Sequence, residues 1–133
     1  MSAEATDSLD GPAEAPSVVF SRVTKRYPGA EEPAVLELDL EVPGGEICVL
    51  VGPSGSGKTT AMRMVNRMVE ITEGEILVGD TSVRERSPAQ LRREMGYVIQ
   101  QIGLFPHRTV TDNIATVPRL SGWDRARVDA RVE

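Results

Sequence analysis

Apolar and polar residues alternate in short segments along the first half of the chain, and each segment predicts one element. Residues 17–23 carry an apolar run that predicts a strand. Over residues 36–42, apolar and acidic side chains alternate with the period of two that is typical of a half-buried strand. The apolar positions of this second strand are Leu36, Leu38, Leu40 and Val42, and the acidic ones are Glu37, Asp39 and Glu41.

A third apolar segment differs from the first two because it does not alternate. Ile47, Cys48, Val49, Leu50 and Val51 follow one another without a polar residue. Such a run predicts a strand that is covered on both faces, as strands of parallel sheets are. We therefore expect a parallel core sheet to begin here.

Helical spacing follows. Apolar residues recur at i, i+3, i+4 and i+7 and predict a helix after residue 60; they are Ala61, Met64, Val65 and Met68. A turn is expected at residues 72–75, and strands at residues 76–78 and 97–99.

Three further helices are marked by their ends. Ser87 to Gln90 fits a capping box with proline at the first helical position, which predicts a short helix from Pro88 to about Arg93. A longer helix is expected from about Val110, with its end at residues 120–122. Asp124 is placed to cap another helix that continues to residue 132. Strands and helices thus occur in the order of one α/β unit.

Length and charge set limits on this picture. The chain has 133 residues, enough for one modest domain, and carries 15 Lys and Arg against 20 Asp and Glu. Residues 1–16 contain acidic residues, prolines and no basic residue, so we expect a disordered acidic tail before a domain over residues 17–133. The rest of the chain is nearly balanced in charge, which argues against nucleic acid as a partner.

The single cysteine and the lack of long apolar segments exclude other classes. Cys48 is the only cysteine, so neither an internal disulfide nor a zinc cluster built on cysteines is possible. No apolar run is long enough to cross a bilayer, and no secretory signal precedes the domain. These features favour a cytosolic protein.

The strongest chemical signal follows the apolar run directly. Residues 52–60 match G-x-x-x-x-G-K-[ST], the pattern of a phosphate-binding loop. Glycines allow backbone N–H groups to turn toward a phosphate, and the next helix presents its positive dipole end to the same anion. Lys58 is expected to bind β- and γ-phosphate oxygens, and Thr59 to bind Mg²⁺. The nucleotide-binding residues expected here are Gly52, Pro53, Ser54, Gly55, Ser56, Gly57, Lys58, Thr59 and Thr60.

With this loop in place, residues 17–132 resemble the ATP-binding subunit of an ABC transporter. The resemblance implies an α/β P-loop NTPase fold in which N-terminal antiparallel strands precede the start of the parallel core sheet. In that family an aromatic residue between the first two strands stacks on adenine, and Tyr27 falls at that place. The resemblance therefore implies ATP and Mg²⁺ as cofactors.

A second motif resembles the Q-loop of the same family. The resemblance gives Gln100, at the end of the strand expected at residues 97–99, contacts to Mg²⁺ and to the attacking water; Gln101 is the alternative. It also makes the loop after this glutamine, with Leu104 and Phe105, the place where a transmembrane subunit docks. The alternative without a function is that the two glutamines only cap the end of a strand and that the apolar cluster at Leu104 and Phe105 is buried.

Residues 64–70 and 96–107 look most like the importers of glycine betaine and related quaternary amines such as choline and carnitine. This resemblance implies an energy-coupling subunit that lies in the cytoplasm at the inner face of the membrane. Its implied partners are transmembrane permease subunits and a second ATPase subunit, with a solute-binding protein as an indirect partner.

Several family motifs are missing from this sequence. No apolar run ends in Asp-Glu, so the Walker B aspartate and the catalytic glutamate do not occur, and Trp123 and Asp124 stand where a signature motif would continue. His107 lies in the Q-loop segment and does not match the switch histidine. About half of the ATPase domain is thus expected, inactive alone, with apolar sheet edges uncovered.

Two other functions stay open on the sequence. The first is a truncated nucleotide-binding module without hydrolysis. The second is a small P-loop kinase acting on a metabolite, for which a basic lid could come from Arg84, Arg86, Arg92 and Arg93.

Overall fold

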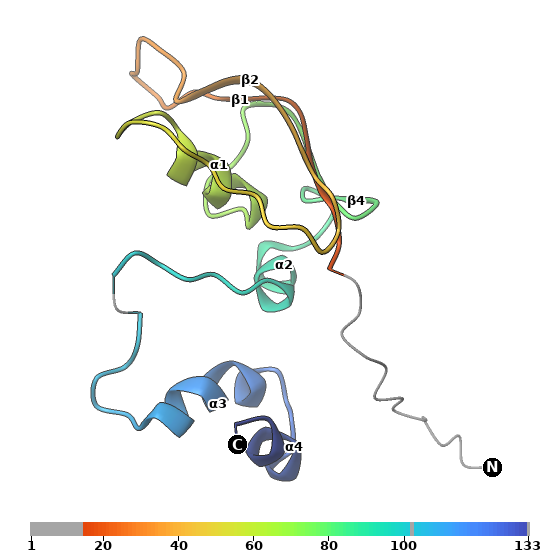
Figure 1. Ribbon diagram of the computed structural model, residues 1–133, viewed down its shortest axis with the longest axis vertical. Coiled ribbons are helices and arrows are strands. Elements are labelled where there is room, and N and C mark those ends of the chain that lie inside the picture. Colours follow the sequence, from red (N-terminus) through yellow and green to blue (C-terminus); the bar gives the residue numbers. More distant parts are fainter. Residues whose placement is uncertain (1–14, 102, 133) are drawn as a thin grey trace, which may run out of the picture. The chain divides into compact units, whose positions relative to one another are not determined.

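The computed structural model describes residues 15–101 and 103–132, which fall into two compact units, residues 1–88 and 89–133. Figure 1 shows the elements of both units along the chain. The acidic tail expected over residues 1–16 lies, up to residue 14, outside the described residues. Each unit is described by itself below.

The first unit is built on a four-stranded antiparallel sheet in the order β2-β1-β3-β4 (Figure 1). Its strands are β1 (Val18–Lys25), β2 (Val35–Val42), β3 (Glu73–Val78) and β4 (Thr81–Ser82). The strands predicted at residues 17–23, 36–42 and 76–78 are therefore confirmed. Helix α1 (Lys58–Val65) connects the phosphate-loop segment to the rest of this unit.

A small apolar core joins the sheet to α1. In the central register, Phe20 of β1 lies opposite Leu40 of β2 on one side and Ile76 of β3 on the other. The helix contributes Ala61 and Met64, the residues of α1 that are buried. The buried apolar residues of the unit are Phe20, Val23, Ala61, Met64, Ile71, Ile76, Val78 and Val83.

The alternation of exposed and half-buried residues in β2 is broken at the start of the strand. Leu38, Leu40 and Val42 are half-buried as predicted, but Leu36 is exposed and Val35 takes the inner side instead. The cause is a register shift between β1 and β2, with Glu37 in the left-handed region at φ 44°. A bulge of this kind inserts one residue and moves the preceding side chains to the opposite face.

The turn expected at residues 72–75 was wrong for most of its length. Glu73, Gly74 and Glu75 already belong to β3 and lie against β1. Gly74 has φ 81°, and a Cβ at this position would collide with the carbonyl oxygen of Arg22. The glycine marks close backbone approach inside a bulged pair of strands, which a local reading takes for a turn.

The strands predicted at residues 47–51 and 97–99 are not formed. Both segments are irregular, and most of their apolar side chains are exposed. A strand requires a neighbour to which its backbone can hydrogen bond, and the described part of the chain pairs neither segment with one. The prediction of strands at these two segments is therefore wrong for the described residues, because an apolar run indicates burial but does not supply a hydrogen-bonding neighbour.

Helix α1 also ends earlier than its apolar spacing predicts. Asn66 is the C-cap, its side chain accepts the N–H of Met68, and Arg67 has φ 54°. Met68 therefore leaves the helix and is exposed. A short polar side chain that accepts a backbone N–H two residues on competes with continued helix.

The three helices predicted after residue 87 are confirmed. They are α2 (Pro88–Glu94), α3 (Val110–Leu120) and α4 (Arg125–Val132). Between α3 and α4, Gly122 has φ 80°, and the Asp124 carboxylate accepts the N–H of Arg127 as a helix cap. Ala115 of α3 and Val128 of α4 are buried. Among the described helices, none combines the length and apolar character that a bilayer span requires.

Candidate nucleotide-binding site

The phosphate-loop residues form a tight turn that leads into α1. Gly55 and Gly57 both lie in the left-handed region, at φ 85° and 86°, where glycine is favoured. Gly57 is the N-cap of α1, and no side chain caps the first N–H groups of that helix. These donors point along the positive end of the helix dipole, which suits an anion at this position.

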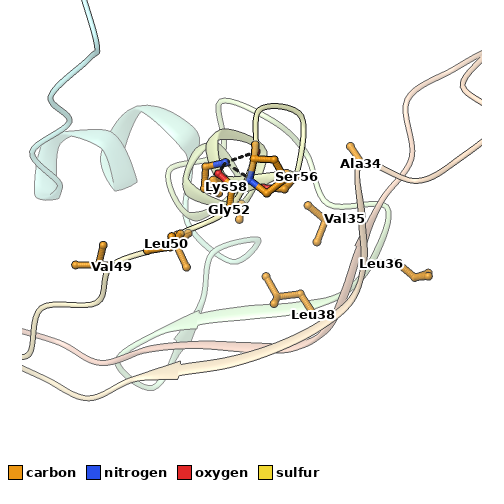
Figure 2. Close-up of a pocket in the computed structure, with 13 residues that line it drawn as sticks. Ala34, Val35, Leu36, Leu38, Val49, Leu50, Gly52, Ser56 and Lys58 are labelled. Carbon is orange, nitrogen blue, oxygen red and sulfur yellow. Dashed lines mark hydrogen bonds between the residues drawn. The ribbon is translucent and has the colours of Figure 1, made fainter.

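The Lys58 side chain folds back onto its own loop. Its Nζ donates to the carbonyl oxygens of Gly52, at 2.8 Å, and Pro53, at 2.6 Å, and to Ser56 Oγ at 3.0 Å. Figure 2 shows Gly52, Ser56 and Lys58 of this cluster among the residues that line the neighbouring hollow. All three acceptors carry partial negative charge, so the loop holds the ammonium at the place where phosphate oxygens would compete for it.

A close backbone contact ties the phosphate loop to the β1–β2 loop. A Cβ on Gly57 would collide with the carbonyl oxygen of Ala34. The backbone N–H of Ala34 in turn donates to the carbonyl of Lys25 at 2.8 Å, which closes the β1–β2 loop. Sequence reasoning missed Ala34, because no pattern marks a residue whose role is to present a backbone oxygen.

Tyr27 lies in this same β1–β2 loop. Tyr27 is 42% exposed, and the Lys25 ammonium lies 4.9 Å from the centroid of its ring. The Tyr27 carbonyl accepts the N–H of Ala30, and Gly29 completes the turn at φ 79°. The contact between Ala34 and Gly57 therefore places the loop that carries the tyrosine next to the phosphate loop.

A hollow of about 490 Å³ opens beside the phosphate loop. Val35 and Leu38 of β2 lie on one side of it and Leu50 on the other, with Gly52, Ser56 and Lys58 at the polar end (Figure 2). An apolar recess with a few polar groups at one end is the usual form of a site for a small organic ligand.

The residues present fit Mg²⁺ only when phosphates accompany the ion. Thr59, the second residue of α1, is exposed and offers one hydroxyl oxygen. Among the described residues, no group of three or more His, Cys, Asp or Glu side chains could hold a metal ion. Because Mg²⁺ typically binds through few protein ligands together with phosphates and waters, one hydroxyl beside a phosphate site suits its chemistry.

The second unit holds the other predicted site residues. Gln100 and Gln101 are both exposed in an irregular stretch before α3, and Ile102 lies outside the described residues. Leu104 and Phe105 are exposed, as an interpretation in which they meet another protein requires. The roles of these four residues stay predictions.

Asn113 organises the loop that carries Phe105, which sequence reasoning did not foresee. Its Oδ1 accepts the N–H of Phe105 at 2.7 Å, and its Nδ2 donates to the carbonyls of Phe105, Arg108 and Thr109. The Arg108 guanidinium lies 4.8 Å from the Phe105 ring centroid, and His107 contacts the same ring edge-on. The loop that carries Phe105 is therefore held in place by the hydrogen bonds of Asn113. An asparagine in the first turn of α3 was the only signal.

The start of α3 carries a carboxylate with a perturbed pKa, that of Asp112. Thr109 Oγ1 accepts the N–H of Asp112 and donates to its carboxylate, and Arg119 also pairs with that carboxylate at 3.1 Å. The Thr109 hydroxyl and the Arg119 guanidinium hold the pKa of Asp112 below its usual value. A negative charge in the first turn also favours the helix dipole.

Replacing Thr109 with alanine should lower the free energy of unfolding by about 1 kcal/mol, because the N-cap is lost.

The Asp112 carboxyl has a lowered pKa in the folded state. The stability that its charge contributes is therefore present above the ordinary aspartate pKa of about 4 and is lost in more acidic solution. The stability difference between the native chain and Asp112→Asn should therefore shrink between pH 7 and pH 3. Urea unfolding followed by circular dichroism at both values measures it; a constant difference would contradict the assignment.

The glycine-rich turn, the lysine that follows it and the helix N-terminus together define a P-loop nucleotide-binding protein. Comparison with known families identifies the family within this class. The sequence profile of the ABC transporter family matches residues 35–133, and the chain belongs to that family.

Curated relatives are identical to this chain at close to half of the aligned positions. The osmoprotectant import ATP-binding protein OsmV of Salmonella typhimurium is 45% identical over 119 residues, in an alignment that covers 87% of this chain and 31% of that protein. The glycine betaine uptake system ATP-binding protein YehX of Escherichia coli is 49% identical over 116 residues, 87% of this chain and 37% of that protein. The chain thus spans about a third of the length of these relatives.

Solved structures show the same fold. The ATP-binding cassette MJ0796, in a dimeric post-hydrolysis state with ADP and phosphate, matches with a TM-score of 0.73 and 27% identity over 86% of this chain and 53% of that one. A bacterial Atm1-family ABC exporter with ATP bound matches with a TM-score of 0.69 and 35% identity, over 87% of this chain and 20% of that one. The predicted fold class, a P-loop NTPase of the ABC type, is confirmed.

Proposed function

We propose that this chain is the nucleotide-binding part of the energy-coupling subunit of an ABC importer for osmoprotectants such as glycine betaine, choline or carnitine. The observation that carries the proposal is the phosphate loop with Lys58, set beside the loop of Tyr27. The solute class rests on the relatives, which are named for osmoprotectant, carnitine and glycine betaine transport.

In this proposal different residues of the first unit bind different parts of the nucleotide. The N–H groups of the phosphate loop and α1 bind the phosphates, and Lys58 turns from its own loop to the β- and γ-phosphate oxygens. Thr59 contributes its hydroxyl to Mg²⁺, which neutralises phosphate charge when bound. Tyr27 stacks on the adenine through the ring face that Lys25 does not cover.

The proposed setting is the cytoplasmic face of the cell membrane. Permease subunits would meet the loop of Leu104 and Phe105, a second ATPase subunit would complete the nucleotide site, and a solute-binding protein would act through the permease. Gln100 is proposed to contact Mg²⁺ and the attacking water in that complete assembly. Exposure of Leu104 and Phe105 on a loop framed by Asn113 supports the first of these contacts.

Isothermal titration of the full chain with Mg-ATP tests the proposal, with phosphate release followed in the same samples. We expect saturable binding of ATP without release of phosphate by this chain alone.

Binding without release also agrees with a nucleotide-binding module, so the importer role is tested separately. The measurement is ATP-dependent binding of the chain to the permease of a related osmoprotectant system. A folded chain that binds no nucleotide would overturn the proposal, and transfer of phosphate to a metabolite would favour a kinase.

The Tyr27 stacking role has its own test. Replacing Tyr27 with alanine should weaken ATP binding about 5- to 150-fold, because stacking of a base on an aromatic ring is worth about 1–3 kcal/mol. Tyr27→Phe keeps the ring and should bind nearly as well as the native chain. Equal losses in both variants would assign the effect to the hydroxyl and exclude stacking.

A further inference from the structure

Thr72 lies in the segment between α1 and β3, and its hydroxyl binds the backbone of the residue before Tyr27. Thr72 Oγ1 accepts the N–H of Arg26 at 3.0 Å and donates to the carbonyl oxygen of the same residue at 3.4 Å. The two residues are 46 positions apart in the sequence, so the fold makes this contact. One hydroxyl therefore holds both backbone polar groups of the residue that leads into Tyr27.

The backbone around Thr72 is itself held, which presents the hydroxyl at a defined place. The N–H of Thr72 donates to the carbonyl of Thr24 at 3.0 Å, next to the pairing of Thr24 with Glu73 between β1 and β3. Ile71 is buried, and its carbonyl accepts the Arg84 guanidinium at 3.1 Å. A side chain with such support can hold a second segment in position.

The loop that carries Tyr27 is thus attached at both of its ends. At the end before β2, a Cβ on Gly57 would collide with the carbonyl oxygen of Ala34. At the end after β1, the Thr72 hydroxyl holds Arg26. Gly57 precedes α1 and Thr72 follows it, so both attachments come from the segment that contains this helix. Together they fix where the loop lies relative to the phosphate loop.

The Tyr27 side chain depends on this backbone for its direction. Tyr27 is exposed, so neighbouring side chains do not enclose its ring. The Lys25 ammonium lies 4.9 Å from the ring centroid, and attraction to a cation favours one ring face for that contact and leaves the other for a base. A change in the backbone at Arg26 would turn that second face away from a nucleotide whose phosphates lie at the loop of Lys58.

We propose that Thr72 is a positioning residue for nucleotide binding, which holds the backbone at Arg26 so that the Tyr27 ring faces the adenine. The inference rests on the proposed function, which assigns the adenine to Tyr27. Thr72 acts through the tyrosine and not by contact with the nucleotide. Water can replace a hydroxyl at this exposed position, so the two hydrogen bonds contribute little to folding and mainly direct the loop.

Variants of the full chain test this role by isothermal titration with Mg-ATP. Thr72→Val removes the hydroxyl but keeps the branched shape of the side chain, and it should bind about 2- to 10-fold more weakly, as loss of one hydrogen bond predicts. Thr72→Ser keeps the hydroxyl and should bind within about twofold of the native chain. Thr111→Val makes the same change at an exposed threonine of α3 and should leave binding unchanged.

A double variant separates positioning of Tyr27 from a general weakening of the chain. In a Tyr27→Ala background, Thr72→Val should not change the Kd further, because the ring that it positions is gone. Amide hydrogen exchange at Arg26 should be about 2- to 10-fold faster in Thr72→Val, which reports the lost hydrogen bond without any nucleotide.

The outcomes distinguish this inference from the proposed function. If Tyr27→Ala weakens binding but Thr72→Val does not, the inference is overturned and the proposed function stands. The same conclusion follows if Thr72→Val has equal effects with and without the tyrosine ring, if Thr72→Ser binds as weakly as Thr72→Val, or if exchange at Arg26 is unchanged. If the folded native chain binds no ATP, the proposed function fails and the inference fails with it.

Discussion

Replacing Lys58 with alanine should weaken Mg-ATP binding about 10- to 150-fold, measured as the change in Kd by isothermal titration. The reason is that hydrogen bonds to a charged partner are worth about 1.5–3 kcal/mol each, and the lysine is the cation that the loop holds for the phosphates. In the structure this ammonium is already surrounded by Gly52, Pro53 and Ser56 oxygens. Phosphate oxygens would therefore replace acceptors that the loop now provides.

Lys58→Arg is the matched control for charge. Arginine keeps the positive charge but presents it as a planar fork on a differently shaped side chain, so the variant should recover only part of the lost affinity. Thermal unfolding of all three chains separates binding from stability, since the three lysine hydrogen bonds are in an exposed loop and contribute little to folding. Native affinity in Lys58→Ala would show that the nucleotide binds elsewhere.

Local patterns predicted the elements that local forces decide. The glycine-rich turn before α1, the helix after Ser87 and the helix after Asp124 each follow from residues close in sequence, such as Pro88 at a helix start or Asp124 at a helix cap. These elements were confirmed because hydrogen bonds within a turn or helix do not require a distant partner.

The errors arose where distant residues decide the outcome. Leu36 was expected on the inner face and is exposed, because a bulge at Glu37 depends on how β2 pairs with β1. Residues 47–51 were expected as a strand, but a strand exists only with a neighbour. Gly74 looked like a turn residue because the strand it lies against is about fifty positions away in the sequence.

In the candidate site, too, some residues could be identified from the sequence and others could not. Lys58 and the glycines of its loop could be named from the sequence, since one contiguous motif carries them. Ala34 could not, because it acts through a backbone oxygen that any residue possesses. Asn113 could not either, because its contacts to Phe105 and Arg108 depend on the path of the loop before α3. Motifs identify chemistry, whereas the positions of the supporting residues require the fold.

Gly57 is the residue at which fold and site depend on each other most directly, so Gly57→Ala should have a large effect on both. Alanine must adopt φ 86°, which costs about 1–2 kcal/mol, and its Cβ would collide with the Ala34 carbonyl, which adds about 1–3 kcal/mol as overpacking. Relief of that collision moves the phosphate loop away from the β1–β2 loop. We therefore expect a lower free energy of unfolding together with weaker ATP binding.

Gly55→Ala is the matched control, since Gly55 has nearly the same φ, 85°, but no heavy atom within 4 Å of a Cβ built there. Backbone strain is thus common to both variants, and only Gly57→Ala has the collision. Urea unfolding should show Gly57→Ala to be the less stable of the two by about 1–3 kcal/mol. Equal stabilities would mean that the loop moves away without cost, and that Ala34 does not fix the distance between the tyrosine loop and the phosphate loop.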